Sequence, residues 1–502
     1  MSLKKGQTYE GTVTEYRFPD KGIVNIDGQS VAVKGALPGQ KVSFSISRKR
    51  TEGLSEGRLG EVMERSPLEN ADPTCPHFGK CGGCTYRRLE YENQLNLKAG
   101  TVEEMLRKVY PEMTFEGIIG SPDINGYRNK MEFTFGDECK NGPFALGLHS
   151  KGSFHDILNL TDCRLVHEDL NIIRNVTRDF FNDLYTAGKI DFNHKLTHRG
   201  YLRHLLVRRS VFNKEILVAL VTTTPDQCDK IDPDAEQRII NEYAGTLLSL
   251  EKEKRLEGRI AGICHIYNNS LSDVVKSDRT DILYGVDHIY ESISGLKFRI
   301  SLFSFFQTNS KGCEKLYEKA REYASYDGGG VIYDLYSGTG TIAQLMSPAA
   351  SEVIGIEIVE EAVMSARENA QLNGIGNVRF IAGDVMKVLC GEEGAGIPKP
   401  DMIILDPPRE GINPKALGRI LGYGVDRIVY ISCKPTSLAN DLAAFKQAGY
   451  DLAKAACVDM FPHTVHVETV CLLSNRKPDT KVRIDVDLED YYRIKDAKKN
   501  QN

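Results

Sequence analysis

A cysteine, Cys433, stands where the apolar, strand-like run RIVYIS gives way to a polar turn, KPTS. A residue just past the C-terminal end of a core strand faces the edge of an α/β sheet where ligands bind, rather than the core. A thiolate attacks well and leaves well, so this cysteine could form a transient covalent bond. The alternative is a buried structural cysteine, which is a common role for this residue type.

A glycine-rich turn and several acids follow other strand-like runs. In VIYDLYSGTGTIA, Gly338 and Gly340 let the backbone bend sharply and approach a ligand closely. Glu357 ends the next run, where it could accept hydrogen bonds from a ribose. Asp384 and Asp406 end the third and fourth runs, and Asp406 is followed by Pro-Pro-Arg. The glycine pattern alone also fits a dinucleotide site.

The elements that must hold these residues form one alternating pattern from about residue 300 onward. Apolar, β-rich runs are separated by helical stretches, which predicts an α/β fold with a doubly wound, mostly parallel sheet. The four strand ends resemble those of class I methyltransferases, so we favour that class over a dehydrogenase. The runs are VIYDLYS, EVIGIEI, VRFIAGD, DMIILDPP and RIVYISC.

Further motifs extend this resemblance to one family. Phe305-Phe-Gln307-Thr-Asn, the Asp334–Gly340 turn, Asp406-Pro-Pro-Arg, Ser-Cys433-Lys-Pro and the stretch ending in His466-Val-Glu468 occur in this order. Together they resemble the RNA uracil-C5 methyltransferases, over nearly the whole chain. An amino-group methyltransferase would have an aromatic residue after Pro-Pro, and a cytosine-C5 enzyme would have its cysteine after the fourth strand.

The resemblance implies a reaction and a set of roles. Cys433 would add to carbon 6 of a uridine, which makes carbon 5 nucleophilic toward the methyl group of S-adenosylmethionine. Glu468 would be the general base that removes the carbon 5 proton, and Asp406 would touch both cofactor and uracil. His463 and His466 are more typical of structural positions. The implied cofactor contacts are Gln307, Tyr336, Gly338, Thr341, Glu357, Asp384 and Asp406.

A second constellation is the compact motif Cys75-x5-Cys81-Gly-Gly-Cys84, in a stretch rich in turn residues. Four thiolates can hold zinc or an iron–sulfur cluster, and the spacing alone favours zinc. The family resemblance instead implies a 4Fe-4S cluster and points to Cys163 as the fourth ligand, with Cys139 as the rival. The reaction is redox-neutral, so we expect a structural or RNA-holding role for the metal site.

The chain divides into six predicted segments. Residues 1–65 read as five short strands with an Asp27-Gly28 turn, which indicates a small barrel of the OB type and resembles an RNA-binding TRAM domain. The other segments are a cysteine-bearing loop (66–92), a helix that packs on the catalytic domain (93–124), a central α+β RNA-binding domain (125–300), the methyltransferase domain (301–476) and a charged tail with a disordered end (477–502).

Composition and charge limit the cellular location and the binding partners that we expect for the protein. The 502 residues carry a formal net charge of −5, and no apolar run is long enough to span a bilayer, so we expect a cytoplasmic protein without a membrane partner. We also expect a monomer that binds RNA and not DNA. Local basic groups could hold phosphates: Arg48, Lys49, Arg50, Lys195, Arg199, Arg203, Arg208, Arg209 and the run Tyr127-Arg-Asn-Lys130.

Family members that act on transfer RNA usually lack the barrel and the cysteine motif, whereas members that act on large-subunit ribosomal RNA tend to have both. The sequence therefore favours 23S ribosomal RNA as the substrate. A transfer RNA methyltransferase and a non-catalytic RNA-binding protein are the alternatives. The second of these would not need to keep Cys433, Glu468 and a cofactor turn together. A flavin- or folate-dependent methylase is disfavoured by the pattern of Glu357 and Asp384.

Overall fold

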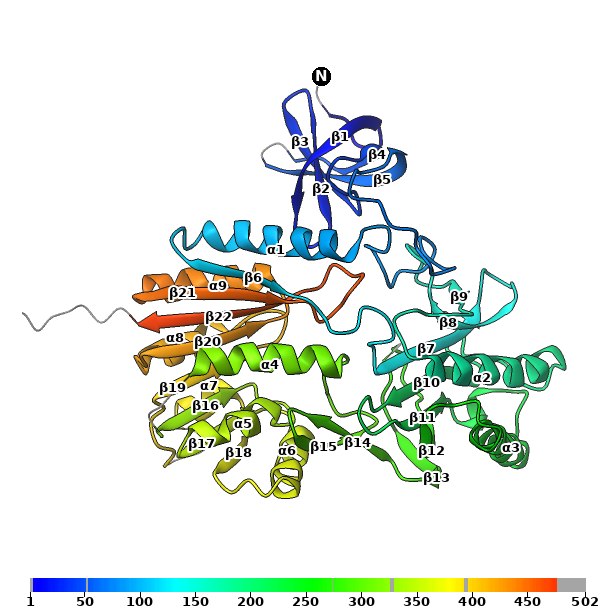
Figure 1. Ribbon diagram of the computed structural model, residues 1–502. Helices are drawn as coiled ribbons and strands as arrows, with labels where there is room; N and C mark the ends of the chain where they lie inside the picture. The colour runs from blue at the N-terminus through cyan, green and yellow to red at the C-terminus, as the bar shows by residue number, and fades with distance from the viewer. Residues whose placement is uncertain (1–2, 51–52, 273, 326–328, 392–395, 476–502) are drawn as a thin grey trace, which may run out of the picture.

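The computed structural model describes residues 3–50, 53–272, 274–325, 329–391 and 396–475. A small barrel lies at one end, above two lobes that are each built around a β-sheet (Figure 1). The predicted tail, 477–502, lies outside the described residues. Within the described chain, no helix combines the length and apolar character needed to cross a membrane.

The N-terminal barrel confirms the prediction of five short strands. It closes in the order β1-β2-β3-β5-β4 around a small apolar core that includes Phe44. Asp27 and Gly28 both have positive φ, 49° and 80°, as a tight hairpin turn requires. The strands are β1 (Thr8–Arg17), β2 (Lys21–Ile26), β3 (Gln29–Lys34), β4 (Lys41–Arg48) and β5 (Ser55–Glu64).

After the cysteine-bearing loop, the chain forms a helix and then a strand, where the sequence predicted a helix alone. Helix α1 covers Tyr91–Arg107, and Val102 and Leu106 are buried in the core of the catalytic lobe. Pro111 follows, where a helix cannot easily continue. Strand β6 (Thr114–Ile119) then pairs in parallel with a strand from the end of the chain.

The central lobe holds a seven-stranded mixed sheet in the order β13-β12-β11-β10-β7-β8-β9. Helices α2 (Glu168–Thr186) and α3 (Pro233–Lys252) pack together over it. The strands are β7 (Lys130–Asp137), β8 (Phe144–His149), β9 (Ile157–Asn159), β10 (Leu202–Arg209), β11 (Glu215–Thr222), β12 (Arg259–Tyr267) and β13 (Arg279–Gly285). The hairpin of β14 (His288–Ile293) and β15 (Leu296–Ser301) follows this sheet in the chain. Its buried side chains belong to one apolar core that also includes residues of the central lobe and of the next lobe.

The catalytic lobe is an eight-stranded sheet, ordered β18-β17-β16-β19-β20-β22-β21-β6. Of the eight described strands, seven run in the same direction, and β22 is antiparallel to both of its neighbours. The strands are β16 (Val331–Leu335), β17 (Glu352–Glu357), β18 (Val378–Ala382), β19 (Met402–Leu405), β20 (Arg427–Ser432), β21 (Tyr450–Val458) and β22 (Glu468–Asn475). The apolar runs of the sequence analysis thus form the predicted strands.

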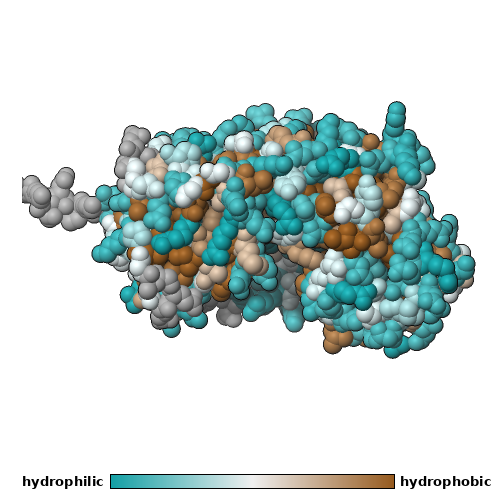
Figure 2. All heavy atoms as spheres, turned by 90° about the horizontal axis from the view of Figure 1, so that it is seen from below, coloured by the Kyte–Doolittle hydropathy of each residue, from teal (hydrophilic) through white to brown (hydrophobic). Residues whose placement is uncertain are grey.

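Helices cover both faces of this sheet, and a separate apolar core lies on each face. One face carries α4 (Ser310–Ala324), α5 (Thr341–Met346) and α6 (Glu360–Leu372), and the other carries α1, α7 (Val385–Leu389), α8 (Pro414–Gly422) and α9 (Pro435–Gln447). On the underside of the molecule, hydrophobic residues form separate groups among hydrophilic ones, and the surface is indented between the two lobes (Figure 2).

Candidate active site and cysteine pocket

The residues predicted to bind the cofactor gather at one edge of the catalytic sheet, because parallel strands all end on the same side. Glu357 is the last residue of β17, Asp384 lies two residues beyond β18, and Asp406 follows β19 directly. Cys433 follows β20 in the same way. Strand β22 runs in the opposite direction, so its first residue, Glu468, reaches this edge too.

The turn after β16 has a strained backbone that is built around glycines. Tyr336, Gly338 and Gly340 have φ of 68°, 52° and 75°, and positive φ is unfavourable for tyrosine. A Cβ on Gly340 would lie 2.5 Å from the ring of Phe380, so only glycine fits there. No described atom lies within 4 Å of the Cβ position of Gly338, so this part of the turn borders open space.

Hydrogen bonds fix the acids around this turn. The Glu357 carboxylate accepts from the backbone N–H groups of Gly338 (3.1 Å) and Val359 (2.9 Å). Asp384 caps α7 by accepting from the Lys387 N–H at 3.2 Å. Burial, followed by the charges of Asp384 and Asp441, raises the pKa of Tyr336 to about 12.

The turn has buried polar atoms that a ligand could satisfy. Among the described residues, Asp334 Oδ1 and Ser337 Oγ are buried without a hydrogen-bond partner. Burial, followed by the charge of Asp406, raises the pKa of Asp334 to about 8. Buried polar groups are normally paired, so these atoms indicate that a polar ligand belongs in the turn. The residues present therefore fit a bound cofactor.

Gln307 and Thr341 complete the predicted set from two other segments. Gln307 lies in the loop before α4 and interacts with the buried phenol of Tyr317. The charge of Asp406 contributes to raising the pKa of this phenol, and the interaction with Gln307 lowers it. The backbone carbonyl of Gln307 accepts from Asn129 Nδ2 at 3.0 Å. Thr341 is the buried first residue of α5, directly after the glycine turn. The structure thus places Gln307 beside Tyr317 and Thr341 at the turn.

Cys433 and Glu468 are neighbours on adjacent strands, since Ser432 pairs with Thr469 in the β20–β22 ladder. Glu468 is only 4% exposed. Burial first, and then the charge of Asp406, raises its pKa to about 8, while Arg409 opposes this. Burial and the charges of Glu468 and Asp406 raise the pKa of Cys433 to about 11. Desolvation raises the pKa of the half-buried Asp406 to about 7.

Arg409 ends the Asp-Pro-Pro-Arg motif, for which the sequence predicted no separate role of the arginine. In the structure it interacts with the Cys433 thiol and lowers its pKa against the effects of burial and the carboxylates. The signal was present in the sequence, because Arg409 follows Pro408 at the strand end next to that of the cysteine. A cation in this position favours the thiolate form of Cys433.

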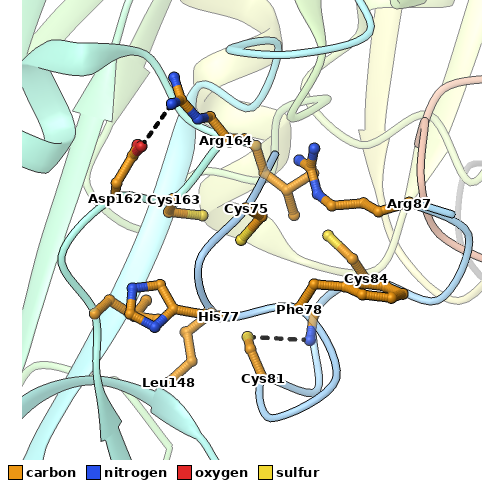
Figure 3. Close-up of a pocket in the computed structure, with 13 residues that line it drawn as sticks. Cys75, His77, Phe78, Cys81, Cys84, Arg87, Leu148, Asp162, Cys163 and Arg164 are labelled. Carbon is orange, nitrogen blue, oxygen red and sulfur yellow. Dashed lines mark hydrogen bonds and ion pairs between the residues drawn. The ribbon is translucent and has the colours of Figure 1, made fainter. Parts of the chain in front are cut away.

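The four predicted cysteine ligands, Cys75, Cys81, Cys84 and Cys163, line one pocket, and their sulfurs face a shared space (Figure 3). Cys139, the rival, is exposed and is not among the lining residues. Burial is the main cause that raises the pKa of Cys81, of Cys163 and of Cys84, the last to about 11. Sequence separation gave no indication that Cys163 and the cysteine-bearing loop meet.

The spacing of these sulfurs is wide for a single ion. Within the described ranges, the one His/Cys/Asp/Glu group with all ligand atoms within 4.8 Å of one another is His167, Asp169 and Glu257, so no three pocket thiols are that close. A tetrahedral zinc with 2.3 Å bonds would hold its sulfurs about 3.8 Å apart. A cluster of four irons holds its thiolates further apart than one ion does.

Two buried arginines interact with the cysteines of this pocket: Arg87 lines it, and Arg174 interacts with Cys163. Nη1 of Arg87 donates to Asn125 at 3.1 Å, whereas Nε and Nη2 are buried with no partner in the described chain except the nearby Cys84 thiol. Arg174 is fully buried and donates to two asparagine oxygens, Asn171 Oδ1 and Asn175 Oδ1. Burial lowers its pKa to about 10, and the nearest charge that opposes this is Cys163. Buried cations need a negative partner, and an anionic centre held by the cysteines would supply it.

The structure corrects the predicted phosphate-binding role of three arginines on β10. Arg203, Arg208 and Arg209 are all at most 6% exposed. Arg203 donates to the backbone carbonyls of residues 268, 270 and 272, and Arg208 donates to those of residues 302 and 304. Arg209 pairs with Asp169 and Glu257. The alternation of basic and apolar residues suggested exposed arginines on β10. The whole strand is instead buried, and its arginines bind neighbouring segments.

A largely parallel sheet with a glycine-rich turn after β16 and carboxylates at the neighbouring strand ends defines an S-adenosylmethionine-dependent methyltransferase. The family model described as tRNA (Uracil-5-)-methyltransferase matches residues 267–394 and 396–476. An uncharacterized RNA methyltransferase of Caldanaerobacter subterraneus is 44% identical over 473 residues, which cover 94% of this chain and 99% of the relative. The chain belongs to the RNA uracil-C5 methyltransferase family, whose members are S-adenosylmethionine-dependent enzymes.

Two further similarities support this assignment. An uncharacterized RNA methyltransferase of Clostridium tetani is 43% identical over 481 residues, with coverage of 96% of this chain and 100% of the relative. The crystal structure of Pyrococcus abyssi tRNA (uracil-54, C5)-methyltransferase, in complex with S-adenosyl-L-homocysteine, has a TM-score of 0.67 and 24% identity. The match covers 93% of this chain and 100% of that one, which shows the fold.

Proposed function

We propose that this enzyme methylates carbon 5 of a uridine in 23S-type ribosomal RNA through a covalent bond between Cys433 and carbon 6. The observation that carries the proposal is the neighbouring position of Cys433 and Glu468 at the sheet edge where the cofactor turn after β16 also lies. Nucleophile, base and methyl donor must all meet one base, and the sheet edge brings their residues together.

The reaction follows from the side chains at this edge. The Cys433 thiolate, favoured by Arg409, forms a bond to carbon 6, and the electron pair moves into the ring so that carbon 5 can attack. S-adenosylmethionine, when bound at the glycine turn, supplies an electrophilic methyl group. Glu468 then takes the carbon 5 proton, the bond between sulfur and carbon 6 breaks, and the thiolate is regenerated.

Ionisation of the carboxyls suits this order of steps. The pKa of Glu468 is about 8 and that of Asp406 about 7, so each is poised near neutral pH. A base with a pKa near the working pH combines sufficient ionised form with sufficient basicity.

We assign Asp406 to the binding of both the cofactor and the uracil. We assign six further residues to the binding of the cofactor: Gln307, Tyr336, Gly338, Thr341, Glu357 and Asp384. We also assign the sheet to the class I methyltransferase fold.

We further propose that Cys75, Cys81, Cys84 and Cys163 hold a 4Fe-4S cluster. The wide spacing of their sulfurs and the two buried arginines beside them support an anionic cluster over zinc. The chemistry at Cys433 requires no electron transfer, so the cluster would stabilise the segments around it. We assign the N-terminal barrel to an RNA-binding TRAM domain, with Arg48, Lys49 and Arg50 on its exposed end.

Transfer RNA is the second candidate substrate, and a specific observation favours it. The fold match to a protein named as a tRNA (uracil-54, C5)-methyltransferase covers all of that chain and 93% of this one. A protein named as acting on transfer RNA thus shares the overall fold, so the barrel does not by itself select ribosomal RNA.

The deciding experiment uses total RNA from cells that lack the gene, incubated with purified enzyme and methyl-labelled S-adenosylmethionine. The RNA is separated by size and digested to nucleosides. Label in 5-methyluridine from the 23S fraction supports the proposal. Label in 5-methyluridine from the transfer RNA fraction instead would mean that the enzyme carries out the same reaction on transfer RNA, the second candidate substrate. Label in 5-methylcytidine overturns the uracil assignment.

A further inference from the structure

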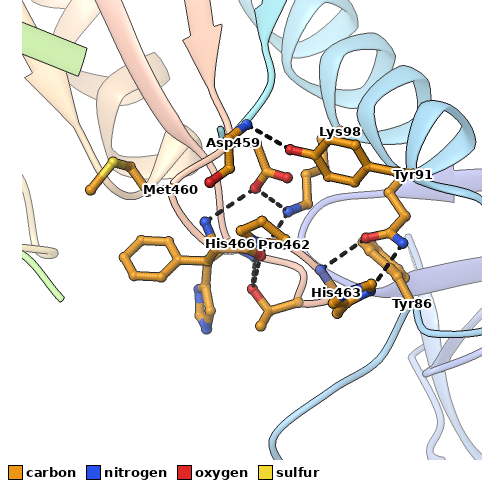
Figure 4. Close-up of polar contacts among 12 residues, drawn as sticks. Tyr86, Tyr91, Lys98, Asp459, Met460, Pro462, His463 and His466 are labelled. Carbon is orange, nitrogen blue, oxygen red and sulfur yellow. Dashed lines mark hydrogen bonds and ion pairs between the residues drawn. The ribbon is translucent and has the colours of Figure 1, made fainter. Parts of the chain in front are cut away.

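The loop that leads into Glu468 is held mainly by residues from outside the β16–β22 region. This loop, residues 459–467, connects β21 to β22 and will be called the base loop, since Glu468 follows it directly. Figure 4 shows helix α1 lying against it, with polar side chains of the helix turned toward the loop. The position of Glu468 therefore depends on how these partners hold the base loop.

The first contact is a buried ion pair between α1 and the start of the loop. Lys98 Nζ lies 2.7 Å from Asp459 Oδ1, and the two side chains are 1% and 0% exposed. The same ammonium donates to the backbone carbonyl of Phe461 at 3.1 Å, and Asp459 Oδ1 accepts from the Phe461 N–H at 3.1 Å. One amine thus binds the loop at two points and fixes its first turn.

The second contact surrounds His463, which is 7% exposed and has a positive φ of 66°. Gln94, one helical turn before Lys98, accepts from the His463 N–H at 2.9 Å, and its own amide lies 3.2 Å from His463 Nδ1. The carbonyl of His463 accepts from the N–H groups of Thr85 (2.8 Å) and Tyr86 (3.0 Å). A strained conformation persists only where neighbours determine it, and here four hydrogen bonds do so.

Two more segments complete the enclosure of the loop. Tyr127 donates through its hydroxyl to the carbonyl of Pro462 at 3.0 Å, and Asn309 Nδ2 donates to that of Met460 at 3.0 Å. The ion pair and these hydrogen bonds end on residues of the base loop rather than on Cys433 or Glu468. Their effect on catalysis would therefore be transmitted through the base loop to Glu468.

We propose that Gln94 and Lys98 are positioning residues that hold the base loop so that Glu468 reaches the carbon 5 proton. The inference rests on the proposed function, in which Glu468 is the base. It assigns a distinct step to these residues: they serve proton removal rather than addition of Cys433, which is placed independently by the end of β20. Loosening the loop should therefore stall the reaction after the covalent bond to RNA has formed.

The test compares two variants with different chemistry. Lys98→Met/Asp459→Asn removes the amine without leaving a buried charge, and the asparagine can still accept from Phe461. Gln94→Ala removes the two contacts to His463 together with one hydrogen bond to the backbone carbonyl of Leu89. Each variant is incubated with S-adenosylmethionine and total RNA from cells lacking the gene, and the covalent protein–RNA complex is measured on denaturing gels beside 5-methyluridine formation. RNA containing 5-fluorouridine, which has no carbon 5 proton to remove, reports addition and methyl transfer alone.

We expect 5-methyluridine formation to fall at least tenfold in both variants. The covalent complex should build up on ordinary RNA, and its rate of formation on 5-fluorouridine RNA should stay within twofold of wild type. Tyr110→Phe is the matched control, because it removes one buried hydrogen bond (2.8 Å, to the carbonyl of Tyr450) between the end of α1 and the same sheet, far from the base loop.

Three results would count against the proposal. Wild-type turnover in both variants overturns it, and so does an equal loss of complex formation and product, which would mean that α1 supports only the general fold. Glu468→Gln serves as the reference for a stalled base. If Glu468→Gln forms no complex while the wild type forms 5-methyluridine, the base assignment fails, and the positioning role fails with it.

Discussion

Cys433 and Glu468 stand next to each other just beyond the last pair of the β20–β22 ladder, Ser432 with Thr469. The two strands are antiparallel, so the end of one and the start of the other meet at the cofactor edge. Each residue also alters the acidity of the site, since the Glu468 charge raises the pKa of the thiol. This relationship leads to predictions that separate the two roles.

Replacing each residue should stop the reaction at a different point. Cys433→Ala should still bind S-adenosylmethionine and RNA but form neither covalent complex nor 5-methyluridine. Glu468→Gln should form the complex and release product about 10²- to 10⁴-fold more slowly, the usual contribution of a general base. Denaturing gels and nucleoside analysis measure both, and normal turnover by Glu468→Gln would show that another group removes the proton.

Reactivity of the Cys433 thiol should change in opposite directions in two variants. At pH 9 Glu468 is ionised, because its pKa is about 8. Glu468→Gln removes a negative charge that raises the thiol pKa, so alkylation should become faster. Arg409→Ala removes the cation that lowers it, so alkylation should slow down. A shift of half a unit to one unit gives roughly three- to tenfold changes.

The alkylation rate of Cys433 can be followed with iodoacetamide by mass spectrometry of its peptide, between pH 8 and 10. The exposed Cys139 in the same samples is the internal control. Its rate should be the same in all three proteins. A uniform change in both cysteines would point to an altered fold rather than to local charge.

Gly340→Ala should destabilise the enzyme and weaken cofactor binding. The new Cβ would lie 2.5 Å from the Phe380 ring on a backbone with φ of 75°. Strain and overpacking together cost about 2–4 kcal/mol of unfolding free energy. Gly374→Ala is the matched control, since Gly374 has φ of 67° but no described atom near its Cβ position, so only the strain remains. Chemical denaturation gives both values, and equal losses would contradict the role of Phe380.

The cysteine pocket should contain iron and sulfide after purification without oxygen. We expect about four of each per chain, bound as a cluster with visible absorption. Arg174→Met should shift the reduction potential to more negative values, on the order of tens of millivolts, because a nearby cation favours the reduced, more negative cluster. Arg178→Met, four residues further along α2 and paired with Asp179, is the control. Stoichiometric zinc without iron would rule out the cluster.

The basic end of the barrel should contribute to RNA affinity and not to chemistry. Arg48, Lys49 and Arg50 are all exposed, so replacing the three by alanine should leave the fold intact. For three lost phosphate contacts, the salt dependence of RNA binding should weaken by roughly 2 in the slope of log K against log salt. The maximal rate should be unchanged. Lys252→Ala/Lys254→Ala on the far lobe serves as the control for net charge.

The sequence predicted correctly those strands and turns that depend on the residues of one short segment. The apolar runs that end at Glu357, Asp406 and Cys433 became parallel strands, because continuous β-branched runs between helices are typical of buried parallel strands. Shared strand direction then placed the candidate residues at one edge. The Asp27-Gly28 pair likewise gave its turn, because few other residues tolerate positive φ twice in succession.

Features that depend on distant partners could not be predicted. Nothing within Thr114–Ile119 shows that this segment pairs with β21 at the far end of the chain. The arginines of β10 look like an RNA-binding stripe until their carbonyl acceptors are known. Gln94 and Lys98 read as polar positions on a helix surface, yet the structure buries both against residues more than 360 positions later.

That long separation has a consequence for how the enzyme is made. Helix α1 emerges from the ribosome early, whereas the base loop is synthesised more than 350 residues later. Contacts so distant in sequence are slow to form, because a large loop must close before any of them stabilises the fold. In a nascent chain Gln94 and Lys98 therefore wait for the base loop to be synthesised, and the enzyme becomes an active catalyst only when α1 and this loop meet.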